Sequence, residues 1–307
     1  MFQSAIIIVN YNTSLLTTQT VQSLTEKCNV ANSQIIIVDN GSEYDDYSTL
    51  KDNLYNLQLS NILLHRSRIN TGFSGGNMLG VQFANAQYYV FLNSDVLFEE
   101  DPISPMINYL ENHSEVSIIG CQSKDENGNF YKPFDYKIGV LNELLPDNLL
   151  TKLFPKQNLN RKKPLNKPTE VDAVPGSLFI CNSKDFDSVG GLDTNMFLYY
   201  EEKDLAYRIQ KQLKKKIISL PNVSYIHLKG KSTKPSIHSR LELKISQFYT
   251  IRKNLPFYQY IIFYIYTFIL FNLKGWFSSK NRAFLKLLWQ GMPLQKSLKL
   301  KQKIQAI

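Results

Sequence analysis

Three acidic side chains crowd together in the segment FLYYEEKDLAYR, at residues 197–208: Glu201, Glu202 and Asp204. Their aromatic neighbours offer little solvation, and crowded carboxylates raise one another's pKa. A carboxylate with a raised pKa suits general-base catalysis, and such groups gather at active sites. Acidic residues are also typical of the first turn of a helix, where they are stabilising. This segment alone leaves both interpretations open.

Asp95 and His227 have the chemistry of metal ligands. Asp95 follows the apolar run YYVFL in the segment LNSDV, and a carboxylate at that place can hold a divalent ion that bridges a diphosphate. His227 lies in YIHLKGKST, and imidazole and carboxylate are compatible ligands of one ion. A helix-capping role for Asp95 and a structural role for His227 are the alternatives.

Two other polar segments follow apolar runs. Asp39 ends one run in IIIVDNGS, where its carboxylate can accept hydrogen bonds from a base or ribose, or cap a turn. The segment NTGFSGGNMLG, residues 70–80, places glycines before a helix, so that the backbone can approach a phosphate. It matches neither the dinucleotide fingerprint nor the phosphate loop. An ordinary loop–helix junction remains the alternative.

Short apolar runs precede these residues and fit buried strands. The four runs are residues 4–9, 34–38, 61–65 and 88–92. Helical spacing at residues 13–24 and 75–86 separates them. Continuous apolar strands that alternate with helices predict an α/β fold whose mostly parallel sheet has helices on both faces. Because ligands of such sheets bind beyond the carboxyl ends of the strands, we expect the site there.

The second half of the chain is more varied. Residues 121–170 are polar and irregular, and we expect a loop there, because strand-like sequence resumes at Val171. Helical spacing over residues 237–248 precedes a 20-residue stretch, 254–273, that has no formal charge and eight aromatic residues. We therefore divide the chain into an α/β domain, residues 1–235, and a helical, basic and aromatic extension, residues 236–307.

Charge is unevenly distributed along the chain. Residues 211–307 carry 19 basic residues and one acidic residue, Glu242, whereas residues 1–210 carry 16 basic and 25 acidic residues. This asymmetry indicates a basic segment for a polyanion or an anionic membrane. A nucleic-acid binder would interleave aromatic residues with arginine, whereas this segment is rich in lysine and its aromatic residues gather in an uncharged block. The N-terminus lacks a signal-peptide pattern and the three cysteines form no close pair, so we expect a reduced, cytoplasmic protein.

The uncharged stretch 254–273 has about the length that crosses a bilayer core. Pro256 near its start, its four tyrosine hydroxyls and its flanking lysines and arginines favour a position in the membrane interface. Residues 274–307 add eight bases and no acid, and each base contributes about 1 kcal/mol beside an anionic leaflet. The aromatic residues of this last segment include Trp276, Phe277 and Trp289. We expect the protein on the inner face of the cell membrane; packing of the aromatic residues against the core is the alternative.

Taken in order, eight segments resemble the motifs of family 2 glycosyltransferases with the GT-A fold. The segments are IIIVNYN, IIIVDNGS, NTGFSGGNMLG, VFLNSDV, VDAVPGS, FDSVGGLD, FLYYEEKDLAYR and HLKGKS. They cover about residues 4–235 and are most similar to the bacterial rhamnosyltransferase-like branch that builds O-antigen and capsule. The resemblance implies a GT-A catalytic domain and a sugar-transferring enzyme.

The resemblance also implies a role for each matched residue. Asn10 and Asp39 face the nucleotide base. Further residues line the donor site: Asn70, Gly72, Gly75, Gly76, Asn77 and Ser94. Asp95, the last position of the family's D-x-D motif, binds a divalent cation (Mg²⁺ or Mn²⁺) together with His227. The first position of that motif is Asn93, so one acidic contact is missing.

The catalytic base of the family corresponds to Glu202, where Asp is more common, and Glu201 is the substitute. Asp204, the third acid of the cluster, more plausibly positions the segment through Arg208 at i+4. The implied reaction is one in-line displacement that inverts the anomeric centre. In it, Glu202 deprotonates the acceptor hydroxyl while the cation balances charge on the leaving diphosphate.

The resemblance favours dTDP-L-rhamnose as the donor, with UDP-hexoses or UDP-galactofuranose as alternatives, and a polyprenyl-diphosphate-linked glycan as the acceptor. A non-catalytic, membrane-attached scaffold with a degenerate transferase fold is the competing class, and a donor-hydrolysis assay separates the two. An oxidoreductase is disfavoured because its glycine fingerprint is absent.

Overall fold

A mixed sheet of ten strands forms the centre of the computed structural model, which describes residues 1–155, 157–228, 231, 236–275 and 279–305. Its strands are β1 Phe2–Asn10, β2 Ser33–Asn40, β3 Ile62–Ser67, β4 Ala86–Asn93, β5 Val96–Leu97, β6 Val116–Lys124, β7 Phe130–Tyr131, β8 Thr169–Glu170, β9 Leu178–Asn182 and β10 Lys216–His227. The order across the sheet is β3-β2-β1-β4-β9-β6-β10-β5, with β7 beside β6 and β8 beside β10.

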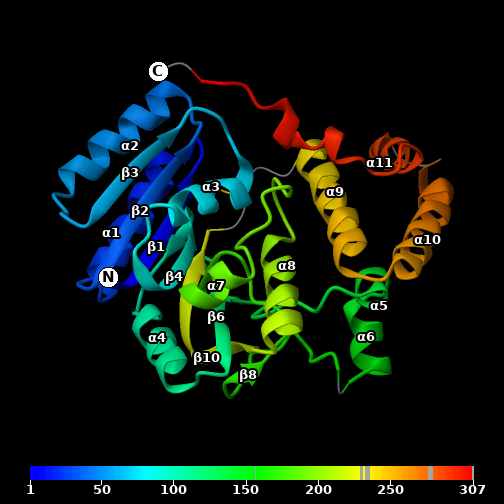
Figure 1. The fold of residues 1–307 in the computed structure, drawn as a ribbon, viewed down its shortest axis with the longest axis horizontal. Helices are drawn as coiled ribbons and strands as arrows, with labels where there is room; N and C mark the ends of the chain where they lie inside the picture. Colours follow the sequence, from blue (N-terminus) through cyan, green and yellow to red (C-terminus); the bar gives the residue numbers. More distant parts are fainter. Residues whose placement is uncertain (156, 229–230, 232–235, 276–278, 306–307) are drawn as a thin grey trace.

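Helices cover both faces of this sheet, as predicted, and others lie to one side (Figure 1). The helices are α1 Ser14–Lys27, α2 Tyr44–Asn56, α3 Gly72–Val81, α4 Ile103–Asn112, α5 Val140–Leu144, α6 Asp147–Leu153, α7 Ser183–Ser188, α8 Glu201–Arg208, α9 Ile237–Asn254, α10 Phe257–Gly275 and α11 Ser279–Trp289. Helices α1, α2 and α4 pack on one face, and α3, α7 and α8 pack on the other.

The first four long strands confirm the predicted parallel arrangement. Strands β3, β2, β1 and β4 are parallel neighbours, and consecutive buried isoleucines of β1 alternate between the two faces. Their registers place Asn10 opposite Asp39, and Val9 opposite Asn93. The polar residues that end these strands therefore lie at one edge of the sheet.

Three expectations about secondary structure need correction. Strand β9 runs antiparallel between β4 and β6, so the sheet is less parallel than predicted. Residues 121–170 are not an irregular loop: they continue β6 and contain β7, α5, α6 and β8, with Leu150 fully buried. Helix α3 spans Gly72–Val81 and not residues 75–86, because β4 already begins at Ala86.

Helices α9, α10 and α11 build a third apolar core. Phe248 of α9, Phe263 of α10 and Leu288 of α11 are buried together, and Ile138 from the segment before α5 joins them. The proposed boundary at residue 235 falls beside residues 232–235, which lie outside the described residues. No helix in the described part of the chain is long and apolar enough to cross a membrane. The three cysteines are buried and free, in line with the reduced setting expected.

Candidate functional site

A pocket of about 380 Å³, the strand-end pocket, lies where the predicted site residues follow β1, β2 and β4. From the sheet it is lined by Val9, Asn40, Asn93 and Ser94, and from the start of α3 by Asn70, Gly72 and Phe73. Its other walls come from Phe197 and Leu198, from the start of α9, and from Leu298 and Gln302 near the C-terminus.

A second pocket of similar volume, the acidic pocket, adjoins the first. Its acidic and imidazole groups are Asp95, Asp135, Glu201, Glu202 and His227. Three other residues line both the acidic pocket and the strand-end pocket: Phe73, Asn93 and Leu198. A molecule in the strand-end pocket can therefore extend one end toward the carboxylates.

The structure brings Asp95 and His227 together, as the metal prediction requires. The antiparallel pairing of β5 with β10 places His227 opposite Val96, and His227 Nε2 lies 3.2 Å from Asp95 Oδ1. Carboxylate oxygen and imidazole nitrogen are suitable ligands for Mn²⁺, and Mg²⁺ commonly takes one or two protein carboxylates plus substrate phosphates. The two side chains therefore fit a divalent ion that a diphosphate also ligates.

Among the described residues, no group of three or more His, Cys, Asp or Glu side chains could hold a metal ion. Residues 229, 230 and 232 of the HLKGKS segment lie outside the described residues.

Strained backbone aims the two neighbouring glutamates. Tyr199 and Tyr200 have positive φ angles of 74° and 72°, which non-glycine residues rarely adopt. The Tyr200 hydroxyl donates to Glu143 at 2.5 Å and so holds this turn in place. Helix α8 begins directly afterwards, so that Glu201 and Glu202 both line the acidic pocket.

The two glutamates differ in electrostatic state. Burial, and then the carboxylate of Asp135, raise the pKa of Glu202 to about 7. Burial, and then the charge of Glu202, raise the pKa of Glu201 well above its ordinary value. Near neutral pH, a group with the pKa of Glu202 can both take up and release a proton. Glu202 is therefore the better placed general base.

Asp204 lies outside the acidic pocket, so its grouping with the catalytic acids needs correction. Its carboxylate is fully buried and binds Arg208 at 2.8 Å, Lys253 at 2.9 Å and Asn254 at 2.7 Å. The i+4 contact with Arg208 is the one that we expected. Asp204 therefore joins α8 to α9 and does not face a substrate.

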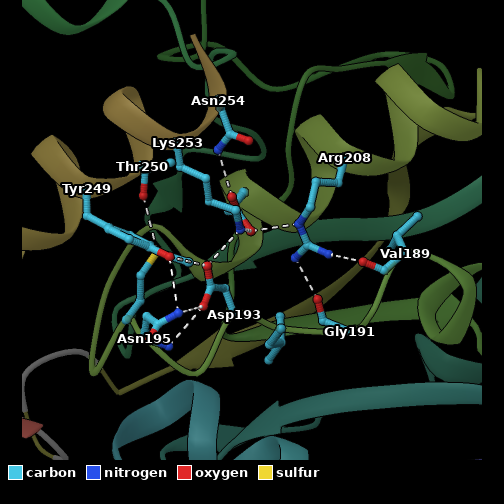
Figure 2. Close-up of polar contacts among 12 residues, drawn as sticks. Val189, Gly191, Asp193, Asn195, Arg208, Tyr249, Thr250, Lys253 and Asn254 are labelled. Carbon is cyan, nitrogen blue, oxygen red and sulfur yellow. Dashed lines mark hydrogen bonds and ion pairs between the residues drawn. The ribbon is translucent and has the colours of Figure 1, made fainter. Parts of the chain in front are cut away.

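Arg208 extends this network into the FDSVGGLD segment (Figure 2). Its guanidinium donates to the carbonyl oxygens of Val189 and Gly191, each at 2.6 Å. Lys253 also binds Asp193 of the same segment at 2.7 Å. Two of the segments that carry the family resemblance are thus joined by structural contacts that hold α8 in position.

Asn10 and Asp39 are fully buried and bind each other instead of lining either pocket. Asn10 Nδ2 donates to Asp39 Oδ1 at 3.0 Å and to Ser42 at 3.1 Å, which joins the ends of β1 and β2. Arg66 lies 3.6 Å from Asp39 and stacks over the Tyr47 ring. Both side chains are already hydrogen-bonded inside the protein, so they do not face a nucleotide base as we expected.

The glycine-rich segment divides into two roles. Asn70 and Gly72 line the strand-end pocket, and the Asn70 side chain accepts from the Gly72 N–H at 2.8 Å. Gly75, Gly76 and Asn77 lie inside α3 and are not pocket residues. A Cβ on Gly76 would meet a Val9 methyl group at 2.8 Å. This glycine lets the helix approach the sheet, not a phosphate.

Four pocket residues were not assigned a role from the sequence: Asp135, Gly176, Leu298 and Gln302. Gly176 belongs to the VDAVPGS segment, and a Cβ there would lie 3.6 Å from Glu202 Oε2. The order of motifs marked Gly176, but no local pattern marked the other three. Ser94, which we had expected in the donor site, does line the strand-end pocket.

Comparison with known proteins gives one family and the same fold. The model of Glycosyl transferase family 2 matches residues 5–179. Rhamnosyltransferase WbbL of Escherichia coli K12 is 27% identical over 177 residues, which are 52% of this chain and 64% of that protein. The chain thus spans less than two thirds of this relative's length.

Two solved structures share the fold at low sequence identity. Mannosyltransferase PcManGT from Pyrobaculum calidifontis, in complex with GDP-Man and Mn²⁺, superposes with a TM-score of 0.57 at 13% identity over 98% of this chain and 79% of its own. GalNAc-T7 with UDP, GalNAc and Mn²⁺ has a TM-score of 0.57 at 17% identity, over 80% of this chain and 47% of its own.

Proposed function

This chain belongs to Glycosyl transferase family 2, and we propose that it is an inverting, metal-assisted hexosyltransferase. In this proposal the sugar moves from a nucleotide donor to a growing lipid-linked polysaccharide of the cell surface, such as O-antigen or capsule. The observation that carries it is the contact between the two pockets. Asn93 borders both, with Ser94 on the strand-end side and Asp95 on the acidic side.

In this proposal each part of the donor has its own place. The nucleotide occupies the strand-end pocket, at the carboxyl ends of parallel strands. The diphosphate lies near Asp95 and His227, which hold Mg²⁺ or Mn²⁺. When bound, such a cation neutralises charge that develops on the leaving diphosphate. The sugar then lies in the acidic pocket beside Glu202.

Glu202 performs the proton transfer in this scheme. Its pKa of about 7 lets it take a proton from the acceptor hydroxyl at neutral pH and release it afterwards. The hydroxyl oxygen attacks the anomeric carbon as the bond to the diphosphate breaks on the opposite side. One such displacement inverts the configuration. Burial, and then the charge of Glu202, raise the pKa of Glu201 well above its ordinary value and so disfavour a second charge in the pocket.

The preferred donor is dTDP-L-rhamnose, which the similarity to the E. coli rhamnosyltransferase supports. UDP-hexoses and UDP-galactofuranose are the alternatives. A donor screen tests both the reaction and the sugar: purified protein and Mn²⁺ are incubated with each donor, and released nucleoside diphosphate is measured. Release that Asp95→Ala and Glu202→Gln abolish supports the transferase. Absence of release or transfer with every donor, with acceptor present, favours the non-catalytic scaffold.

An exposed apolar stripe on α10 supports attachment to an anionic membrane surface. The side chains of this stripe are about half exposed or more, and include Tyr258, Ile262, Ile265, Tyr266, Ile269 and Leu273. Their spacing of three or four residues places them on one helix face, opposite the face that packs in the third core. Figure 1 shows α10 at the edge of the molecule. Part of the aromatic block thus packs inward, and the rest faces outward.

Basic residues accompany this stripe. Arg282, Lys286 and Trp289 are exposed on α11 at helical spacing, and the Trp289 ring contacts Phe268 of α10. An apolar stripe beside cations fits the interface of anionic lipids. Trp276 and Phe277, which we had assigned to the same surface, lie outside the described residues.

Vesicle flotation tests the membrane attachment. Ile265→Glu/Ile269→Glu is expected to abolish binding to phosphatidylglycerol vesicles, because it places two charges in the apolar stripe. Leu15→Glu/Tyr55→Glu is the matched control, since these side chains are 66% and 82% exposed on α1 and α2. Equal flotation of both variants, or a wild-type chain that does not float at low salt, contradicts the attachment.

A further inference from the structure

The C-terminal segment, residues 297–305, reaches from the helical extension to the strand-end pocket; we call it the C-terminal strap. Figure 1 shows the red end of the chain passing from the region of α9 and α11 toward β3 and α2. Leu298 and Gln302 of the strap are wall residues of the strand-end pocket. A segment far from the motifs thus completes the pocket that we assign to the donor nucleotide.

A buried carboxylate anchors the first end of the strap. Glu242 of α9, the single acid among residues 211–307, is 2% exposed. It accepts hydrogen bonds from the Ser297 hydroxyl at 2.7 Å and from the Leu298 N–H at 2.8 Å. A buried carboxylate needs such donors, because burial without them is costly. The contact therefore fixes where Leu298 lies.

The other end of the strap is anchored on the α/β domain, just after β3. Gln305 N donates to the Arg68 carbonyl at 2.7 Å, and Arg68 Nε donates to the Gln305 carbonyl at 3.1 Å. Between the two ends, Lys299 Nζ donates to the Thr194 carbonyl at 2.5 Å. The strap is thus held on both sides of the pocket that it covers.

The strap has two different sides. Leu298 and Gln302, one helical turn apart, face the pocket, and the Gln302 side chain donates back to the Leu298 carbonyl at 2.9 Å. Leu300 between them is 65% exposed. The strap also contains three lysines and no acid, a charge that complements a nucleoside diphosphate.

We infer that the C-terminal strap is part of the donor-binding machinery: Leu298 contributes an apolar wall against the nucleoside, and Glu242 positions it. The inference rests on the proposed function, because it takes the strand-end pocket as the nucleotide site. It adds a determinant of nucleotide affinity that lies outside all eight motif segments. Its loss weakens donor binding and leaves the displacement step at Glu202 unchanged.

Leu298→Ala tests the wall, and Leu300→Ala is its matched control on the exposed side of the same strap. Calorimetry with dTDP and UDP is expected to give a dissociation constant raised about 5- to 10-fold for Leu298→Ala, the size expected from losing part of one apolar contact. Leu300→Ala should bind as the wild type does. In turnover assays the donor KM rises while kcat stays unchanged.

Glu242→Gln tests the positioning role, because it keeps the size of the side chain and removes the charge that accepts both hydrogen bonds. It is expected to raise the donor KM without changing kcat. A chain truncated after Lys301 lacks Gln302 and the contact with Arg68. It is expected to show the same rise in the donor KM. Thermal melting of each variant separates weakened binding from unfolding.

The outcomes separate a failure of the proposed function from a failure of the strap inference. If the wild-type chain binds no nucleoside diphosphate and transfers no sugar, the proposed function fails. If the wild type binds and all strap variants bind equally well, the strap inference alone is wrong. Tighter binding after removal of residues 302–307 also overturns it, since the strap would then obstruct the pocket.

Discussion

Replacing Glu202 by glutamine removes the basic group from the acidic pocket while nearly preserving its shape. This carboxylate, whose pKa burial raises to about 7, lines the acidic pocket together with Asp95 and His227. An amide cannot accept a proton at neutral pH, so we expect turnover to fall by ~10²–10⁴, the usual range for a lost general base. Nucleotide binding should persist, because Glu202 does not line the strand-end pocket.

The pH dependence gives a second measure of the same assignment. Because Glu202 must be ionised to act, kcat/KM of the wild type should rise about tenfold per unit below pH 7 and level off above it. The charge of Asp135 raises the pKa of Glu202. Asp135→Asn should therefore move the midpoint of the profile to lower pH.

Glu201→Gln is the control for this experiment. Burial favours the neutral form of Glu201 and raises its pKa well above its ordinary value, so the uncharged glutamine is expected to be tolerated there. Its turnover should stay close to that of the wild type. Nucleoside diphosphate release at saturating donor and acceptor measures all three variants. An inactive Glu201→Gln beside an active Glu202→Gln would refute the choice of base, and activity in both would refute a glutamate base.

Three further predictions follow from the geometry. Gly72→Ala should cost more than about 2 kcal/mol in chemical denaturation, because its Cβ would lie 2.1 Å from the Phe197 carbonyl oxygen at a φ of +79°; unchanged stability contradicts the close approach. Asp204→Ala should cost about 3–5 kcal/mol by the same measurement, since it removes the carboxylate that pairs with the buried guanidinium of Arg208. Asp95→Ala should weaken Mn²⁺ binding in calorimetry with dTDP present, and full wild-type activity in excess chelator would contradict the metal assignment.

Local patterns were enough to predict the parallel half of the sheet. The isoleucine-rich runs of β1 and β2 bury side chains on both faces of the sheet. A strand that is buried on both faces has a continuous apolar sequence. The position of the site at the carboxyl ends of the strands followed from the same pattern. The order of the eight motif segments predicted the family, which the match to residues 5–179 confirms.

Patterns of residue type were a weaker guide to the role of each side chain. Glu201, Glu202 and Asp204 look alike in sequence, but helical geometry turns Asp204 away into the contact with Arg208. The glycines of α3 suggested a phosphate-binding loop, whereas Gly76 serves the close packing of α3 on β1. The role of an acidic residue or a glycine depends on what it contacts, and the residue type alone does not give that contact.

Only the tertiary structure decided how the strand-end pocket is closed. Arg68 and Gln305 are 237 positions apart, yet the Gln305 N–H donates to the Arg68 carbonyl oxygen and Arg68 Nε donates to the Gln305 carbonyl oxygen. Glu242, which in sequence is a lone acid in a basic segment, becomes the anchor of the strap through its contact with Ser297. Periodicity and propensity describe neighbours within a few residues, whereas these contacts depend on how α9 packs against the rest of the chain. The sequence alone therefore determined the sheet and the family, and the packed chain determined which distant residues complete the site.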